Sequence, residues 1–244
     1  MEGEQTRSGQ AARFKVRKTL NISAKHNQRF LADILDDYLL TECSISGINI
    51  YIMGRPYEFN REETLSKAMD VFWEKGYKAT SIDDLVDRMG IQRGSIYNTF
   101  GDKHELFISA VEYYGEVITS RTLRVLEGEG SPIGNISKFF DVIVNTPPDR
   151  RSKGCLISNT VVELAPHDEE VAIVVRGIMS KIQSAFLECL ERAVEAGELP
   201  RETNTQVLSN FLATSAHGLI VTGKSAIDRE QLRNVVDVIL STLE

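Results

Sequence analysis

The stretch TSIDDLVDRMGIQRGSIYNTF, residues 80–100, contains two short amphipathic segments separated by one glycine. The first segment repeats apolar residues at helical spacing and stops at Gly90, a residue suited to a left-handed helix end. A tight turn then leads to a second segment, about 92–99, from which Ile96 and Phe100 face inward. Two short helices joined by a glycine turn predict a helix-turn-helix, whose second helix enters the major groove of DNA.

The helical pattern continues on both sides of this stretch. A preceding helix, about 60–75, repeats apolar residues at i, i+3, i+4 and i+7 and stops at Gly76. From Asn60 onward no strand pattern competes, and the sequence predicts an all-α chain. Several cap residues support this prediction, because each is followed three positions later by Glu or Gln. These pairs are Asn60 with Glu63, Asp102 with Glu105, Thr203 with Gln206, and Asp228 with Gln231.

Residues 1–52 differ from the rest of the chain. A polar opening leads into one amphipathic stretch, about 30–39, which could form an isolated helix of about three turns. The run Met53-Gly54-Arg55-Pro56 then looks like a fresh beginning. Two interpretations stay open: residues 1–52 are a flexible N-terminal extension, or they result from a mis-assigned start and Met53 is the physiological one. We favour the second.

The composition limits the class of protein. The chain has 244 residues, 42% of them hydrophobic and 26% charged, which is typical of a globular protein of one or two domains. It has neither an apolar run long enough to span a membrane nor the pattern of a secretory signal, so we expect a cytoplasmic protein with no membrane partner. Three widely spaced cysteines predict neither a disulfide framework nor a zinc site, and we expect no metal and no cofactor.

The charge is unevenly distributed along the chain. The net charge of −7 argues against a nucleic-acid partner only if the charge is counted over the whole chain. Residues 105–244 carry 13 basic and 20 acidic residues, whereas residues 53–104 carry 8 and 9. The acidity therefore lies in the C-terminal part, and the middle segment can present a basic face where its cations cluster.

A family resemblance rests on residues 57–117. The residues that carry it are Arg61, Ala68, Phe72, Gly76-Tyr77, Thr80-Ser81, Ile82, Leu85-Val86, Gly90-Ile91, Gly94-Ser95-Ile96-Tyr97, Phe100, Lys103 and Leu106. In this order and spacing they resemble the DNA-binding domain of the tetracycline-repressor-like (TetR/AcrR) transcriptional regulators. The resemblance implies a three-helix DNA-binding domain over 57–117 and a helical ligand-binding and dimerisation domain over 118–244. It also implies repression that a small molecule relieves.

The predicted recognition helix has the chemistry to read bases. Such a helix needs outward residues free for base edges and apolar inner residues, and residues 92–98 alternate in this way. Arg93 can form a bidentate contact to guanine, and Gln92 or Asn98 can reach adenine. Gly94 lets the backbone approach DNA closely because it has no side chain.

Other residues near this helix suit phosphate contacts. These are Tyr97, Lys103, and Thr80 or Ser81, one of which caps the second helix. Gln92 stands where the family usually has a Ser or Thr cap, which weakens the recognition helix by up to ~1 kcal/mol unless DNA orders it. The candidate DNA-binding residues are Thr80, Ser81, Gln92, Arg93, Gly94, Ser95, Tyr97, Asn98 and Lys103.

A mostly apolar helix is expected at about 153–165, ending before Pro166. Its polar residues Cys155, Asn159 and Glu163 lie four apart and form a stripe along one side. Such a stripe indicates either a satisfied buried network or the lining of a cavity. In one branch of the family that the chain resembles, a similar segment lies beside the ligand site. The candidate ligand-binding residues are Cys155, Asn159, Glu163 and His217.

Cys155 also permits two sharper interpretations. It could be a thiol sensor of oxidants or electrophiles, or a metal ligand together with His167 or His217. A lone cysteine on an apolar helix is more often a small buried hydrophobic residue, and we favour that interpretation.

Further helices are expected at about 133–146, 169–196, 204–223 and 229–243. The resemblance implies that the last two form a homodimer across a two-fold axis, so that two recognition helices read a palindromic site in double-stranded DNA. A small-molecule inducer that changes their separation would release the operator.

Two other functional classes are alternatives to a ligand-controlled repressor. A DNA-binding adaptor or activator without an inducer is the alternative, favoured if large side chains close the space around Cys155 and Asn159. The scattered histidines and the lack of a phosphate loop or nucleophile elbow argue against an enzyme.

Overall fold

The computed structural model describes residues 41–45, 48–52, 59–225 and 228–243 of the chain. It divides into two units, residues 1–58 and 59–244, which we describe separately. The amphipathic stretch at 30–39 and the run from Met53 to Pro56 lie outside the described residues. The two interpretations of the N-terminal extension therefore stay as predictions.

The described part of the first unit is a pair of strands that the sequence analysis did not predict. The strands β1 (Thr41–Ile45) and β2 (Ile48–Ile52) pair antiparallel, with Thr41 opposite Ile52 and Ile45 opposite Ile48. β-branched residues favour strands, and isoleucines recur at 45, 48, 50 and 52 on either side of a Ser-Gly dipeptide. That pattern was the available signal for a hairpin.

The second unit begins with the helices predicted around the helix-turn-helix. Asn60, Ser81 and Asp102 each accept a hydrogen bond from a backbone N–H of the first helical turn, and Ser81 rather than Thr80 is the cap of the second helix. Gly90 ends that helix in the left-handed conformation, with φ of 72°. The helices are α3 (Arg61–Lys75), α4 (Ile82–Met89), α5 (Arg93–Phe100) and α6 (Lys103–Tyr114).

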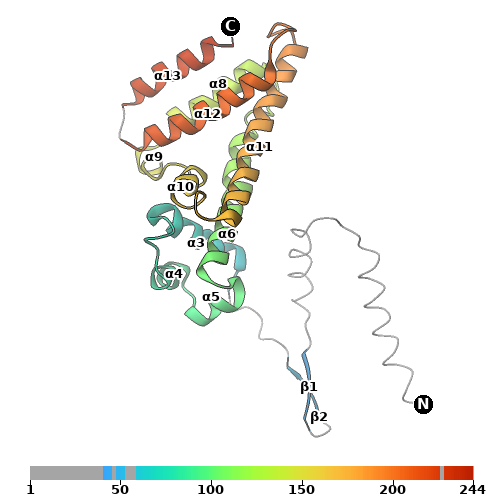
Figure 1. Cartoon of the computed structure of the whole chain (residues 1–244), viewed down its shortest axis with the longest axis vertical. Coiled ribbons are helices and arrows are strands. Elements are labelled where there is room, and N and C mark those ends of the chain that lie inside the picture. Colours follow the sequence, from blue (N-terminus) through green and yellow to red (C-terminus); the bar gives the residue numbers. More distant parts are fainter. Residues whose placement is uncertain (1–40, 46–47, 53–58, 226–227, 244) are drawn as a thin grey trace, which may run out of the picture. The chain divides into compact units, whose positions relative to one another are not determined.

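The rest of the second unit is also helical. Figure 1 shows α3 to α6 at one end, α8, α12 and α13 at the other, and α11 running between the two ends. The described residues of this unit thus confirm the all-α fold class. The elements are η1 (Gly115–Thr119), α7 (Ser120–Leu123), α8 (Pro132–Val144), α9 (Pro148–Lys153), α10 (Leu156–Glu163), α11 (Glu169–Glu195), α12 (Thr205–Gly223) and α13 (Arg229–Ser241).

The helix predicted at 153–165 is present as the shorter α10, which begins three residues later and follows a separate short helix, α9. Pro148 is at the start of α9, where a missing N–H costs nothing. Gly154 follows α9 with φ of 68°, a left-handed conformation that breaks the helix. Cys155 then precedes α10 as its extended cap residue. The α9–α10 corner is therefore a bend rather than a continuous helix.

Of the two remaining cap predictions, that of Thr203 was wrong and that of Asp228 is confirmed. Asn204, not Thr203, caps α12 by accepting a hydrogen bond from the N–H of Val207. Asp228 caps α13, as predicted, but through the N–H of Glu230. Both helices nevertheless begin within two residues of the expected positions.

Two apolar clusters fill the second unit. One cluster contains residues of α3, α4, α5, α6, α10 and the N-terminal half of α11. It includes Phe72, Phe107 and Ile157. The other lies among α8, α11, α12 and α13, where the ring centroids of Phe139 and Phe186 are 4.9 Å apart. The helix-turn-helix therefore shares its core with the helices that follow it. Among the described residues, no helix is long and apolar enough to cross a membrane.

The shared core predicts a large effect of Ile157→Ala on stability. Ile157 is fully buried, and removing its side chain is expected to lower the free energy of unfolding by about 2–5 kcal/mol. Ile173→Ala, at a position that is 56% exposed, is the matched control, with an expected change within about 0.5 kcal/mol. Urea denaturation of both variants measures the difference, and equal midpoints would contradict a core that joins the two groups of helices.

Candidate functional site

Helix α5 presents most of the predicted base-reading residues to solvent. Its buried residues are Ile96 and Phe100, which hold one side of the helix against α4 and α6. Residues three and four apart share a face of a helix, so the residues between Ile96 and Phe100 and those before Ile96 lie largely on the other side. Gln92, Arg93, Gly94, Tyr97 and Asn98 are exposed, and Ser95 is partly buried.

Two features of α5 favour close approach by a large partner. A Cβ built at Gly94 meets no described atom within 4 Å, so the space over this part of the helix is open. Tyr97 keeps 44% of its surface exposed, although it is a large aromatic residue. Gln92 caps α5 without a side-chain hydrogen bond in the described residues, as the sequence analysis expected.

Arg93 already has an ionic partner on α4. Its Nη2 lies 2.5 Å from Oδ1 of Asp83, and both side chains are more than half exposed. Exposed ion pairs contribute little to stability, because water screens them. The guanidinium can therefore leave Asp83 for a base or a phosphate at small cost.

The predicted phosphate-binding residues are not equally available. Thr80 is 2% exposed, and its hydroxyl donates to the carbonyl oxygen of Gly76, so the structure removes it from the surface. Ser81 is exposed, but its hydroxyl caps α4 and donates to Asp84. Lys103 lies with Nζ 4.3 Å from the ring centroid of Tyr77, and burial lowers the pKa of Lys103.

Glu163 lies at a different place from the one the sequence analysis expected. Its carboxylate accepts hydrogen bonds from the backbone N–H groups of Tyr77, at 3.0 Å, and Lys78, at 2.8 Å. Gly76 is required beside it, since φ is 79° and a Cβ there would lie 2.8 Å from Oε2 of Glu163. Glu163 thus connects α10 to the turn between α3 and α4 and does not line the cavity described below.

A second polar contact joins α6 to α11. Nε2 of His104 lies 2.7 Å from Oδ2 of Asp168, whose other oxygen accepts from the N–H of Val171 and caps α11. Burial acts to raise the pKa of Asp168, but the hydrogen bonds from Val171 and His104 outweigh it and leave that pKa below its ordinary value.

A cavity of about 210 Å³ is lined by residues of α3, α6, η1, α7, α8, α9, α11, α12 and α13, and by the bend between α9 and α10. Two of the predicted ligand-binding residues, Cys155 and His217, line it. Burial lowers the pKa of His217, so its imidazole is neutral near pH 7, and its Nδ1 lies 3.1 Å from Oγ of Ser158. Asn159 does not line the cavity, because it donates to the carbonyl of Lys153 and accepts from Nζ of Lys224.

The arrangement of an exposed α5 on a helix-turn-helix, followed by a helical domain with a cavity, matches known proteins. Residues 65–110 match the family described as bacterial regulatory proteins, tetR family, and residues 132–239 match the tetracyclin repressor-like C-terminal domain. The HTH-type transcriptional regulator YezE of Bacillus subtilis (strain 168) is 38% identical over 194 residues, which make up 79% of this chain and 100% of that protein. The chain belongs to the tetR family.

Other relatives agree with this tetR-family membership. The HTH-type transcriptional repressor ComR of Escherichia coli (strain K12) is 26% identical over 190 residues, 77% of this chain and 90% of that protein. A solved structure of a cysteine mutant of the TetR family regulator CifR, complexed with 26-bp double-strand operator DNA, has a TM-score of 0.68 at 30% identity. It covers 77% of this chain and 98% of its own. The tetR-family chain is thus a DNA-binding transcriptional regulator and not an enzyme.

The contact between α6 and α11 predicts a pH-dependent effect of Asp168→Asn on stability. The pKa of Asp168 in the folded protein is below its ordinary value of 3.8, so its ionised form stabilises the fold above that value. We expect the free energy of unfolding to be lower in the variant at pH 7, and the difference to shrink as the pH falls through the folded pKa. Urea denaturation between pH 7 and pH 3 measures this, and a difference independent of pH would contradict it.

Proposed function

We propose that this chain is a homodimeric repressor that a small-molecule inducer releases from a palindromic operator. The observation that carries the proposal is the exposed face of α5, where Gln92, Arg93, Gly94, Tyr97 and Asn98 lie free of the core. Its relatives include repressors, and one neighbour of similar fold was solved on double-strand operator DNA. A regulator of this kind acts on DNA in the cytoplasm.

The exposed residues of α5 divide by chemistry. Arg93 is suited to guanine in the major groove, and Gln92 or Asn98 to adenine. Tyr97 can donate its hydroxyl to a phosphate, while Gly94 and Ser95 let the backbone come near. From the flanking residues, Ser81 and Lys103 remain phosphate candidates, whereas the buried hydroxyl of Thr80 supports a structural role.

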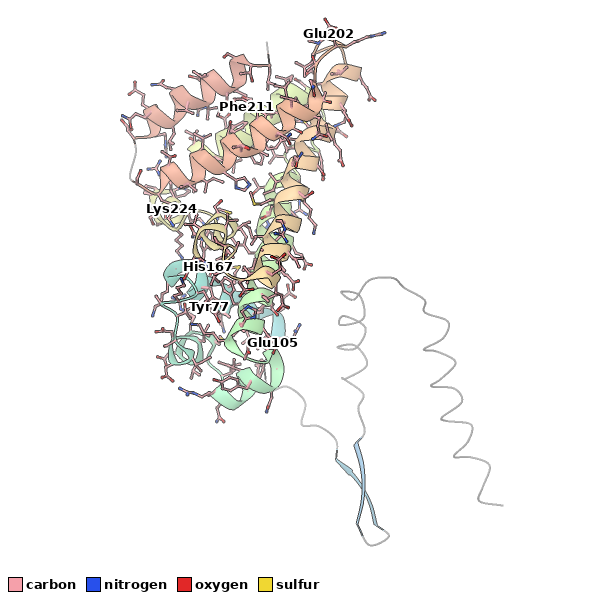
Figure 2. All side chains as sticks on the ribbon, in the orientation of Figure 1. Tyr77, Glu105, His167, Glu202, Phe211 and Lys224 are labelled. Atoms are coloured by element: carbon pink, nitrogen blue, oxygen red, sulfur yellow. The ribbon has the colours of Figure 1, made fainter. Side chains whose placement is uncertain are left out.

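The apolar surface of the last two helices supports a homodimer. Large apolar side chains are usually buried, and a group of exposed ones on neighbouring helices marks an interaction surface. Phe211, labelled on α12 in Figure 2, is 41% exposed, and Val238 on α13 is 67% exposed. A two-fold contact through these helices would place two copies of α5 on one operator. The exposed apolar residues of this surface are Val207, Phe211, Val221, Val235 and Val238.

The cavity supports induction by a small molecule. It is open space beside Cys155, which argues against the adaptor or activator without an inducer. Its lining includes Trp73 of α3 as well as residues of α8 and α12. A ligand there would contact both the DNA-binding helices and the C-terminal helices, and it would favour one arrangement of the two by its differential affinity.

Arg93→Ala tests the recognition surface. We expect the variant to lose about 1–3 kcal/mol of binding free energy, roughly ten- to hundredfold in affinity, and to relax the preference for one base pair. Footprinting on the DNA upstream of its own coding region, at constant salt, measures this. Arg176→Ala is the control, because Arg176 also forms an exposed ion pair but lies on α11. Equal losses in both variants would mean that α5 does not read bases.

Phe211→Glu tests the dimer surface. A carboxylate in the centre of an apolar contact is costly to bury, so we expect a shift from dimer to monomer in analytical ultracentrifugation and weaker operator binding. Val162→Glu introduces the same charge at a side chain that is 76% exposed on α10, and it should remain dimeric. A Phe211→Glu protein that stays a dimer would exclude this surface.

A further inference from the structure

The charged residues around the cavity are all of one sign. These are Arg150 and Arg151 of α9, whereas His217 of α12, which also lines the cavity, is neutral near pH 7. Among the described residues that line the cavity, none is Asp or Glu. Charged groups in a partly closed space of low dielectric normally have a counter-charge, because an uncompensated charge is costly to desolvate. The two arginines therefore have no counter-charge among the described residues that line the cavity.

Arg151 carries the clearest sign of a missing partner. Its Nη1 is buried and has no hydrogen-bond partner within the described part of the chain. A buried donor of a guanidinium group is rarely left unpaired in a folded protein. The carboxylate of Glu74 is already engaged, because it pairs with Lys153 of α9 and with Arg88.

The stem of Arg151 is held in place beside the end of α12. A Cβ built at Gly223 would lie 3.4 Å from Cγ of Arg151, which is an ordinary van der Waals distance, so the stem packs close to this part of α12. The guanidinium is planar and presents two parallel N–H donors, which match a carboxylate. Arg151 lines the cavity, and its guanidinium is therefore a binding group for a small anion there.

The remaining surface of the cavity is mostly apolar. Phe139, Ile143, Ile182 and Leu219 contribute to it, and Trp73 closes one side. An engineered cavity of about 150 Å³ holds benzene, so a cavity of about 210 Å³ has room for a ring or a short alkyl chain with one carboxylate. The apolar walls exclude a strongly hydrated, multiply charged ligand.

We propose that the cavity binds a small apolar monocarboxylate, with its carboxylate paired to Arg151 and its apolar body against Phe139 and Leu219. This inference rests on the proposed inducible function, since it names the chemical class of the inducer. Arg151 is then a ligand-binding residue that the sequence analysis did not identify. Arg151 lies on α9 and Leu219 on α12, so a ligand that contacts both would tie the two helices together.

Trp73 provides a direct readout of binding. It is the single tryptophan of the chain, and it lines the cavity with its ring centroid 5.2 Å from that of Tyr114. Benzoate is the probe, and benzamide is its neutral counterpart of nearly equal shape. We expect benzoate to change the fluorescence of Trp73 with a saturable curve and benzamide to bind at least about tenfold more weakly, because it lacks the charge.

The variants assign the effect to Arg151. Arg151→Gln should weaken benzoate binding by roughly ten- to hundredfold, and Arg151→Lys, which keeps the charge but loses the fork, should lie between it and the wild type. Arg176→Gln removes a charge from α11 away from the cavity and should bind benzoate as the wild type does. Thermal melting confirms that each variant is folded, and Arg151→Lys carries the test if Arg151→Gln is not.

Four outcomes would overturn the proposal: no saturable response to benzoate, an equal response to benzamide, unchanged affinity in the Arg151 variants, or a stronger response to phenyl phosphate. Footprinting of the operator in parallel distinguishes a failure of the carboxylate site from a failure of the proposed function on which it rests. Operator binding without any response to benzoate would refute the carboxylate site and leave the DNA-binding function. A benzoate response without a change in operator affinity would support the site and refute induction through it.

Discussion

Burial of α10 and the start of α11 against α3 and α6 is the constraint on which the rest of the structure depends. Phe72, Phe107 and Ile157 belong to one apolar cluster, so the DNA-binding helices do not form a core of their own. Small helical units have too little interior to be stable alone, and sharing a core solves this problem. Because this core is shared, few side chains lie between the C-terminal helices and α5, and a change of packing in those helices can shift α5.

Polar contacts define the orientation of the joined parts. Apolar packing is non-directional, whereas hydrogen bonds have defined geometry. Glu163 holds two backbone N–H groups of the α3–α4 turn, and His104 contacts the residue that caps α11. Trp73, whose Nε1 donates to the carbonyl of Gly154, makes a third such contact and also lines the cavity. A ligand in the cavity would thus contact one of the residues that connect α3 to the bend between α9 and α10.

The predictions made from the sequence succeeded where function depends on local pattern. The inward direction of Ile96 and Phe100 and the exposure of Arg93 follow from helical spacing, and the structure agrees. They failed where a residue's partner is distant in sequence. Glu163 was predicted to bind ligand because of its place in a stripe, but its partners lie 86 and 85 residues away, at Tyr77 and Lys78.

The sequence by itself determined the helices, most of their caps, the helix-turn-helix and the family, because these depend on the order and spacing of residues close together in the chain. Only the tertiary structure decided which polar residues are available. It buried the hydroxyl of Thr80, bent the chain at Gly154, and placed Arg151 at the cavity without a partner in the described residues. The physical reason is that burial and hydrogen bonding depend on which distant helices pack together, and periodicity contains no information about that choice.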